Sequence, residues 1–426
     1  MSLSFNPRSI TLPAGHFIGG TYVADPNAMA VLAPSDGKIL ADIPIASADL
    51  VDQAVQAAKT ALKTSGWAGW RPRDRLKAMH AWADLIEAEA GTLAQLEAVC
   101  SSRPVAQAIV GDVLTAADQI RFFAEFADKE GGDLVPTSAN QMGFILSEPY
   151  GVVGGITPWN FPISMAGWKM GPALAAGNAI VLKPSEMTPF STLYMAELSV
   201  RAGLPAGLVN VVLGDGATTG TALVAHPDIG KISFTGSTRA GGAIMENIAR
   251  TGIKPMTLEL GGKSPQVVFE DADLDLAADC IARGIMSNAG QVCVAGSRML
   301  VARAVADELA LKIAAKMRRA TAGPTWDEAT AYSPIISEKQ LERIDGIVAA
   351  SRAAGAEILC GGARMDHEGS YYQPTLIAGV TETSPAITEE IFGPVLTMQT
   401  FETEDEATAM ACHPVYGLCA GLYTRD

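Results

Sequence analysis

The chain has 426 residues, of which 48% are hydrophobic and 18% are charged, so it is long enough for two or three domains with sizeable cores. Its net charge of -15 argues against nucleic acid and anionic membranes as partners, because an acidic surface repels both. No run is long and apolar enough to span a bilayer, and the start lacks the pattern of a secretion signal. These features favour a small-molecule partner and a cytoplasmic location.

The six cysteines and five histidines show neither disulfide-framework spacing nor metal-ligand spacing. We therefore expect a reducing compartment and no bound metal.

The first 130 residues predict mainly helices, because apolar residues recur there at helical spacing. Between Gly131 and Pro149 the pattern changes to two short extended runs, which predict a protruding β-hairpin. Such a hairpin is either a surface loop or an arm that pairs with another subunit. Helices are expected at 51–62, 76–96 and 105–126, and the hairpin strands at 133–135 and 142–146.

From Gly151 onward, apolar extended runs alternate with helical segments. This alternation predicts a parallel sheet covered by helices on both faces, which binds ligands at the carboxyl ends of its strands. Strands are expected at 151–157, 178–182, 209–213, 229–234 and 256–260, and helices at 163–175, 191–202, 218–225 and 240–249.

After the glycine pair Gly261-Gly262, which has the composition of a hinge, the alternation begins again and predicts a second α/β domain. Its strands are expected at 266–269, 298–301, 357–359 and 375–377, and its helices at 281–286 and 305–319.

Three strand ends carry motifs of unequal strength. Gly214-Asp215-Gly216 lacks the spacing of a dinucleotide fingerprint, so we interpret it as a tight turn. Gly236 and Ser237 join a strand to a helix, where free amides and a hydroxyl favour a bound phosphate. Lys183 and Glu186 follow another strand. Glu186 can accept two hydrogen bonds from a ribose diol, although a surface ion pair is the alternative.

Cys293 lies among small residues, in a segment rich in glycine. A thiol is nucleophilic as the thiolate, so a reactive cysteine is expected near a helix end, backbone donors or a cation that lowers its pKa. Most cysteines are small buried apolar side chains, and only the motifs elsewhere in the chain distinguish this one.

Six motifs resemble, in the same order, those of the aldehyde dehydrogenase superfamily, in its hydrolytic, NAD(P)-dependent branch. The resemblance covers nearly the whole chain, and six motifs in order could hardly arise by chance. They are Pro158-Trp159-Asn160-Phe161-Pro162, Lys183-Pro184-Ser185-Glu186, Phe234-Thr235-Gly236-Ser237-Thr238, Leu258-Glu259-Leu260-Gly261-Gly262-Lys263, the Cys293 segment, and Glu390-Ile391-Phe392-Gly393-Pro394.

The resemblance implies oxidation of an aldehyde to a carboxylic acid. Cys293 would attack the carbonyl, and Asn160 with the backbone amide of Cys293 would stabilise the oxyanion of the thiohemiacetal. Hydride transfer to the cofactor would leave a thioester, and Glu259 would activate the water that hydrolyses it. Lys169 would support the site electrostatically.

The resemblance also implies the cofactor and substrate contacts. A carboxylate at position 186 would repel a 2′-phosphate, so NAD is expected rather than NADP. No arginine other than Arg298 lies near Cys293 in the sequence, so uncharged aldehydes are expected. The expected cofactor contacts are Trp159, Gly236 and Ser237 at the diphosphate, Lys183, Ser185 and Glu186 at the ribose, and Glu390 and Phe392 at the nicotinamide side. The expected apolar tunnel is lined by Phe161, Met165, Trp168, Val292 and Val294.

By the same resemblance, residues 1–131 and 150–259 form the NAD-binding domain, 132–149 the bridging hairpin and 260–426 the catalytic domain of a homodimer or homotetramer. Family members continue with a segment that finishes the catalytic domain, so the chain is expected to be truncated, which puts its activity in question. Two alternatives stay open. An acylating dehydrogenase that uses coenzyme A would not need Glu259, and a non-catalytic relative would not need Cys293, Asn160 and Glu259 together.

Overall fold

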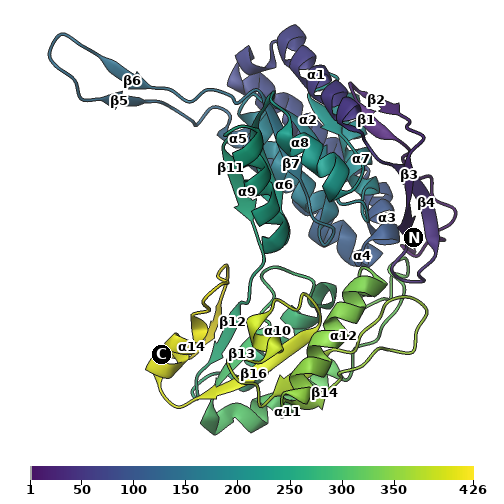
Figure 1. The fold of residues 1–426 in the computed structure, drawn as a ribbon, viewed down its shortest axis with the longest axis vertical. Coiled ribbons are helices and arrows are strands. Elements are labelled where there is room, and N and C mark those ends of the chain that lie inside the picture. Colours follow the sequence, from purple (N-terminus) through teal and green to yellow (C-terminus); the bar gives the residue numbers. More distant parts are fainter. Residues whose placement is uncertain (1) are drawn as a thin grey trace.

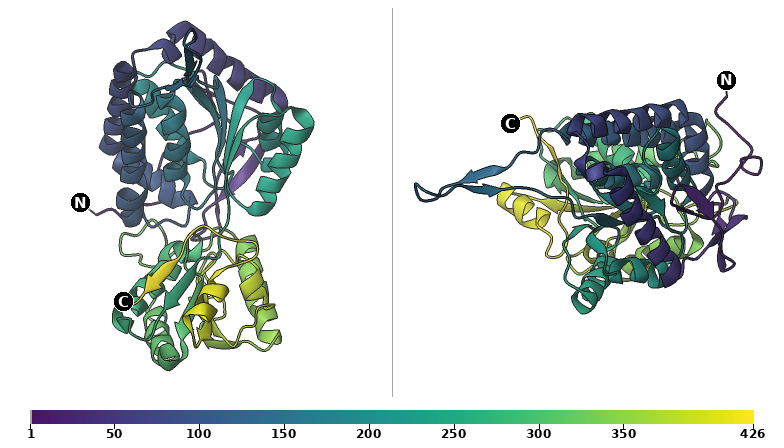
Figure 2. Two further views of the ribbon diagram at one scale, coloured as in Figure 1. Left: turned by 90° about the vertical axis from the view of Figure 1, so that its left-hand side faces the viewer. Right: turned by 90° about the horizontal axis from the view of Figure 1, so that it is seen from above.

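Two separate sheets organise the chain into two lobes, with a thin hairpin projecting from the first (Figures 1 and 2). The structure is a computed structural model and describes residues 2–426. The expected α/β class is confirmed, with a parallel-sheet lobe, a second α/β lobe and a protruding β-hairpin. Within the described residues, no helix has both the length and the apolar character needed to cross a membrane.

The first sheet has seven strands in the order β11-β10-β7-β8-β9-β1-β2. Its five parallel strands are those expected from the alternation, whereas the two antiparallel edge strands have three residues each and show no recognisable period. Their bounds are β7 (Val152–Ile156), β8 (Ala179–Lys183), β9 (Val209–Val211), β10 (Ile229–Thr235), β11 (Met256–Glu259), β1 (His16–Ile18) and β2 (Thr21–Val23).

Helices cover both faces of this sheet (Figure 2). On one face, α6 (Pro162–Ala175) and α7 (Phe190–Arg201) pack against a layer of α2 (Pro72–Ala88), α3 (Ala90–Cys100) and α5 (Leu114–Phe126). On the other lie α1 (Ala48–Ser65), α8 (Thr221–Ala225) and α9 (Thr238–Thr251).

Two expected helices are interrupted. The helix expected at 76–96 breaks at Glu89, whose backbone (φ -97°, ψ 14°) leaves the helical region between α2 and α3. The helix expected at 105–126 contains a π-helical turn, Ala108–Val113, between α4 (Val105–Gln107) and α5. Hydrophobic periodicity predicts neither the break nor the π-helical turn, because apolar residues continue at helical spacing on both sides of each.

The sheet reverses its winding between β7 and β10, which are neighbours. From β7 the chain continues outward to β8 and β9, whereas β10 and β11 lie on the other side. In open parallel sheets such a switch point opens a crevice at the carboxyl ends of the two strands, because the following helices lie on opposite faces. The segment with Trp159 and Asn160 follows β7, and Gly236 with Ser237 follows β10.

The second lobe is built on six strands in the order β14-β15-β16-β13-β12-β17. On one face α10 (Leu274–Met286) and α11 (Ala306–Met317) form a core with Val268, Met299 and Leu396. On the other, α12 (Glu338–Ala353) and α14 (Glu404–Ala411) pack on alternate strand residues. The strands are β12 (Pro265–Val268), β13 (Arg298–Ala302), β14 (Glu357–Cys360), β15 (Thr375–Ala378), β16 (Val395–Phe401) and β17 (Gly421–Tyr423), of which β16 and β17 were not predicted.

The hairpin pairs β5 (Asp133–Val135) with β6 (Gly143–Ile145) in antiparallel register and extends away from the first lobe (Figure 1). Its apolar side chains are exposed, with Leu134 at 67% and Phe144 at 63%. A two-stranded hairpin alone is marginally stable in water, so these side chains form a surface that lacks a cover within the chain.

Candidate active site

The loop between α10 and β13 carries Cys293 and is tightly held. Asn288, Ala289 and Gly290 adopt left-handed backbone conformations in succession (φ 48°, 50° and 70°). A Cβ on Gly290 would lie 2.1 Å from the Gly393 carbonyl oxygen, so glycine is required there. The buried Gln291 side chain donates a hydrogen bond to the Asn288 carbonyl (2.9 Å) and accepts one from the Ile336 N–H (2.9 Å). This loop is therefore fixed by its own backbone and by a buried amide.

Asn160 joins the first lobe to this loop. Its Nδ2 donates to the Gln291 carbonyl (2.9 Å), and its own carbonyl accepts a hydrogen bond from Asn288 Nδ2 (3.0 Å). The backbone N–H of Cys293 has no acceptor among residues 2–426. An amide Nδ2 carries two hydrogens. One of them, together with the Cys293 N–H, is available for an oxyanion beside the thiol.

Opposing effects act on the pKa of the Cys293 thiol. Burial raises the pKa of Cys293, and the carboxylates of Glu259 and Glu390 raise it further, while the Val294 amide opposes them. Of the three expected features, the backbone donors are present and lower this pKa, whereas the charges that act on it are carboxylates. The free enzyme therefore holds a protonated thiol, and a base must remove its proton before it can attack.

Glu259 and Lys169 approach this thiol from the first lobe. Glu259 ends β11 beside Thr235 of β10 and is near enough to Cys293 to act on its pKa. Lys169 is buried on α6. Burial lowers the pKa of Lys169 to about 8, while Glu259 raises it and Lys231 lowers it. The Glu259 carboxylate therefore interacts electrostatically with both the buried Lys169 ammonium and the Cys293 thiol.

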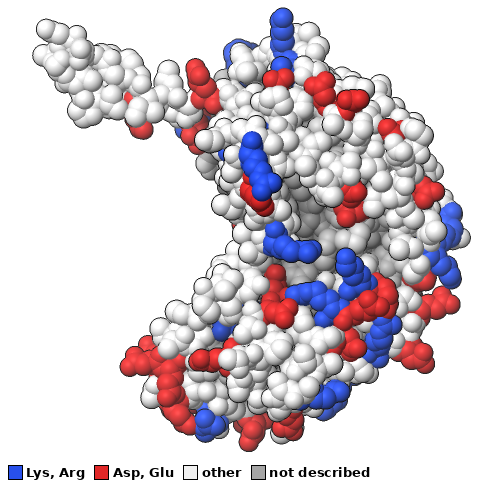
Figure 3. Space-filling view, in the orientation of Figure 1, with Lys and Arg blue, Asp and Glu red and all other residues white. Residues whose placement is uncertain are grey.

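The crevice between β7 and β10 has the features of a phosphate site. At the start of α9, Ser237 Oγ accepts a hydrogen bond from the Ala240 N–H (3.2 Å). The first two N–H groups of the helix have no acceptor among residues 2–426. A Cβ on Gly236 would lie 2.5 Å from the Phe234 ring. The hydroxyls of Thr157 and Thr235 are buried without partners. On the face shown in Figure 3, Lys and Arg side chains also gather along the hollow between the lobes.

At the end of β8, Lys183, Ser185 and Glu186 lie together. Lys183 Nζ donates to the Pro184 carbonyl (3.0 Å) and lies 3.5 Å from Glu186 Oε2. Burial lowers the pKa of Lys183, and Glu186 opposes that shift. Ser185 Oγ accepts the Met187 amide (3.4 Å). The side chain of Glu186 is 32% exposed, so its carboxylate remains accessible.

Glu390, Phe392 and Trp159 connect the lobes beside the cysteine loop. The Trp159 and Phe392 rings meet edge to face with their centroids 5.2 Å apart. Glu390 Oε1 accepts the Gly262 amide (3.0 Å). A Cβ on Gly261 would lie 2.0 Å from Glu390 Oε2. This pair of glycines therefore permits a close approach between segments, in addition to joining the lobes.

The structure separates the five expected substrate contacts into two groups. Phe161, Val292 and Val294 line one cavity of about 270 Å³ beside α10. Met165 and Trp168 do not line it, and Trp168 is 48% exposed beside Phe123.

Arg298 is buried and does not act as a substrate clamp. Its guanidinium donates to the carbonyls of Lys263, Met410 and Ala411, which occupy its three nitrogens. Its role in this structure is to hold the C-terminal end of α14 against the start of β13.

Several residues that hold the site were not among those expected from the sequence. Asn288 and Gln291 are ordinary amides in the sequence, yet both fix the loop of Cys293. On α3, the buried carboxylate of Glu97 accepts the Ile163 amide at the start of α6 (3.3 Å). Only the spacing of Gln291 from the cysteine, inside the motif, could have pointed to it.

Comparisons with known proteins identify the family to which the chain is similar. The model of the aldehyde dehydrogenase family matches residues 22–426. An aldehyde dehydrogenase of Enchytraeus buchholzi is 41% identical over 400 residues, which cover 93% of this chain and 80% of that protein. The structure resembles an indole-3-acetaldehyde dehydrogenase in complex with NAD+ (TM-score 0.96, 36% identity, 99% of this chain and 86% of that one).

Two bacterial enzymes give the same result. An NAD+ complex of the aldehyde dehydrogenase of Bacillus cereus has a TM-score of 0.96 at 37% identity, covering 100% of this chain and 88% of that one. A putative aldehyde dehydrogenase of Burkholderia cenocepacia has a TM-score of 0.94 at 40% identity, covering 98% and 86%. The chain therefore belongs to the aldehyde dehydrogenase family.

Proposed function

We propose that the protein oxidises an aldehyde to a carboxylic acid with NAD as the hydride acceptor, through a thiohemiacetal and a thioester on Cys293. The observation that carries this proposal is the junction of the lobes. Asn160 is bonded to the loop of Cys293, the Cys293 amide is free, and Glu259 acts on the same thiol. Nucleophile, oxyanion donors and base therefore come together from segments far apart in the chain.

The mechanism assigns a task to each of these residues, and two tasks to Glu259. Glu259 takes the proton of the thiol, and the Cys293 sulfur then bonds to the carbonyl carbon, whose oxygen becomes an oxyanion held by Asn160 Nδ2 and the Cys293 amide. When bound, NAD would supply the hydride acceptor, and loss of hydride from this carbon leaves a thioester on Cys293. Glu259 releases the proton of the thiol to solvent and then takes a proton from water, whose oxygen attacks the thioester. The acid is released as the C–S bond breaks, and the sulfur takes the proton back from Glu259 to restore the thiol. Lys169 stabilises the negative charge on Glu259.

The first lobe, residues 1–131 and 150–259, binds NAD, and residues 260–426 form the catalytic domain. The unpartnered helix amides and buried hydroxyls at the β7–β10 crevice suit a diphosphate held by Trp159, Gly236 and Ser237. Lys183, Ser185 and Glu186 hold the adenosine ribose, and Glu390 and Phe392 contact the nicotinamide side. The accessible Glu186 carboxylate favours NAD over NADP, because it would repel a 2′-phosphate.

One assay tests the reaction. NADH formation is followed with a panel of small aldehydes, with and without coenzyme A, for the wild type, Cys293→Ala and the control Cys412→Ala, which changes an exposed cysteine that lines neither cavity. The wild type and the control should form NADH and free acid without coenzyme A, and Cys293→Ala should form none. A requirement for coenzyme A would instead identify an acylating enzyme, and no turnover by the wild type would favour a non-catalytic relative.

A second assay tests the cofactor assignment. Glu186→Ser should raise the kcat/KM for NADP relative to that for NAD, because it removes the carboxylate that disfavours a 2′-phosphate. An unchanged ratio would contradict the role of Glu186.

The hairpin supports a homodimer or homotetramer, in which its exposed strands pair with a second copy of the chain. Leu134 and Phe144 lie on adjacent strands with most of their surface exposed, and edge strands of this kind invite pairing. Light scattering after size exclusion should give an oligomer for the wild type and for Gln141→Glu at the hairpin tip, and a smaller species for Phe144→Glu. A monomeric wild type would reject the proposal.

We also assign the protein to the cytoplasm. All six cysteines are free in the described chain, and unpaired thiols are typical of reducing compartments. Fractionation that recovers the protein outside the cytoplasm would contradict this assignment.

A further inference from the structure

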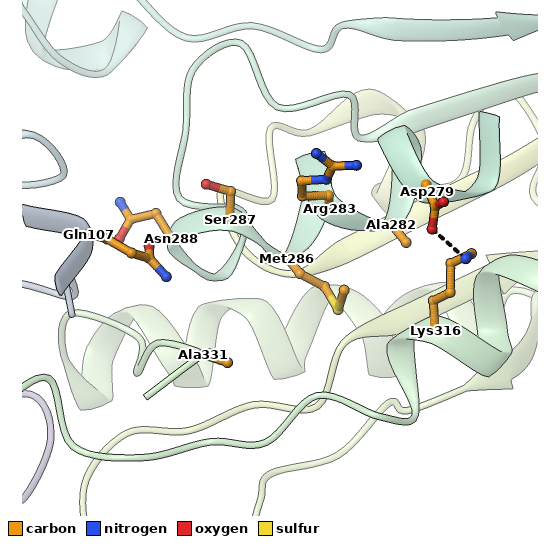
Figure 4. A pocket seen from close by; sticks show the side chains of 9 residues that line it. All are labelled: Gln107, Asp279, Ala282, Arg283, Met286, Ser287, Asn288, Lys316 and Ala331. Carbon is orange, nitrogen blue, oxygen red and sulfur yellow. Dashed lines mark hydrogen bonds and ion pairs between the residues drawn. The ribbon is translucent and has the colours of Figure 1, made fainter. Parts of the chain in front are cut away.

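A second cavity lies along the last turns of α10, next to the one that contains Phe161. Its volume is about 440 Å³. Ser287 lines both cavities, so they adjoin at the end of this helix. Figure 4 shows its lining side chains: Gln107, Asp279, Ala282, Arg283, Met286, Ser287, Asn288, Lys316 and Ala331.

The cavity has one positive charge without a bonded partner. Arg283 makes no hydrogen bond or ion pair with any side chain or carbonyl of residues 2–426. Asp279 and Lys316 are bonded to each other at one end of the cavity, whereas Gln107 and Asn288 lie at the other (Figure 4). The three charged residues thus leave a net charge of +1 on this wall, in a protein whose net charge is -15.

The rest of the lining suits an amphipathic molecule. Ala282, Met286 and Ala331 provide apolar surface, Ser287 provides a polar group on the side of Arg283 that faces Gln107, and Gln107 provides another at the end of the cavity (Figure 4). Asn288 is 1% exposed and its Oδ1 has no hydrogen-bond partner among the described residues. The Nδ2 of the same side chain donates to Asn160. One wall of the cavity is therefore a residue that also supports the oxyanion donor.

The helix links Arg283 to the site of the reaction. Arg283 and Ser287 are four residues apart on α10 and its continuation, a separation of roughly 6 Å along the axis. Beyond Ser287, the smaller cavity is lined by Val292 and Val294, which flank Cys293 in the chain. A linear aldehyde with its carbonyl at Cys293 and its chain in the smaller cavity would direct its far end toward Arg283.

We propose that Arg283 determines substrate specificity by binding a carboxylate at the far end of the aldehyde, so that ω-carboxylated aldehydes are preferred. This inference rests on the proposed function. A guanidinium pairs with a carboxylate through two parallel hydrogen bonds, which suits a group at the open end of an apolar channel. This proposal differs from the expectation of uncharged aldehydes. That expectation was based on the residues near Cys293 in the sequence, whereas α10 brings Arg283 near the site in space.

The simpler role for Arg283 is to stabilise the C-terminus of α10, where it occupies the last turn. The two roles predict different measurements. A helix-terminus role changes stability and treats all substrates alike, whereas a specificity role changes the ratio between a charged and a neutral substrate.

The test uses pairs of aldehydes of equal chain length that end in a carboxylate or in its methyl ester. The wild type should prefer the carboxylate. Arg283→Gln should lower kcat/KM for the carboxylate about tenfold, the effect expected for a charge-assisted hydrogen bond at a partly exposed site, mainly through KM. The ester should react as before. Arg319→Gln, which removes an equal charge from an exposed position after α11, should leave both substrates unchanged.

Binding of glutarate, a dicarboxylate of the product class, gives a second readout that does not depend on turnover. Calorimetry should show weaker binding to Arg283→Gln than to the wild type and Arg319→Gln. Equal losses for both aldehydes, or equal glutarate affinity in all three proteins, would overturn the proposal. If the wild type oxidises neither aldehyde, the proposed function fails by itself, and glutarate binding still decides the role of Arg283.

Discussion

Gly262→Ala should damage the catalytic loop although position 262 contacts no substrate in the proposed mechanism. A Cβ at this position would lie 2.5 Å from the Cys293 carbonyl oxygen, and Cβ atoms essentially never approach such atoms within 3.0 Å. The loop of Cys293 must then move by at least half an ångström. Gly417 and Leu418 lie 3.2 and 3.3 Å away from the same Cβ, so the glycine segment cannot easily shift away instead.

The expected cost has two parts. Overpacking of a fixed site costs roughly 1–3 kcal/mol of stability. Because a 1 Å misplacement of reacting groups can cost about 100-fold in rate, a shift of half that size should lower kcat about tenfold. Thermal unfolding and steady-state NADH formation measure the two effects.

Gly346→Ala is the matched control. Gly346 lies in α12 with open space around its Cβ position, so alanine should stabilise the helix by up to ~1 kcal/mol and leave kcat unchanged. If Gly262→Ala retained the melting temperature and kcat of the wild type, the close-approach argument for the glycine pair would be wrong.

Three further outcomes follow from charged groups. Glu97→Ala should lower the free energy of unfolding by about 2–4 kcal/mol, because it leaves one hydrogen-bond donor on α6 and one on α7 unpaired. Glu97→Gln should retain most of the stability, since burial raises the pKa of this carboxyl and favours its neutral form. Equal melting temperatures for the two variants would contradict this prediction. Burial lowers the pKa of Lys263 from 10.5 to about 7. Below pH 7 the folded wild type therefore buries a charged ammonium, which lowers its free energy of unfolding, and this cost disappears as the pH rises to 10.5. Its stability relative to Lys263→Met should therefore increase over that range in urea unfolding, and a constant difference would refute the shift. Glu259→Gln should shift the midpoint of the pH profile of Cys293 alkylation by iodoacetamide to lower pH, because Glu259 raises the pKa of that thiol. An unchanged midpoint would show that Glu259 does not act on the thiol.

Much of the fold could be predicted because it is encoded locally. Each of the five parallel strands of the first sheet is an apolar run bounded by turn residues, and the hairpin is two extended runs around a polar turn. Short strands such as β1 carry too few residues for a period to appear, and β16 has mixed burial along its length. The break at Glu89 depends on how α3 packs on α7, which no local pattern contains.

For the candidate site, motif spacing and the alternation of strands and helices are properties of the chain alone, so they indicate which chemical groups are present and that Lys183 and Glu259 stand at strand ends. The tertiary structure decided the rest. Asn160 meets Gln291 across 131 residues, the pKa of Cys293 is raised by carboxylates from two distant segments, and Arg283 faces a cavity that one helix shares with the site. Burial and electrostatic interaction depend on distances in space, and a sequence specifies those distances only after it has folded.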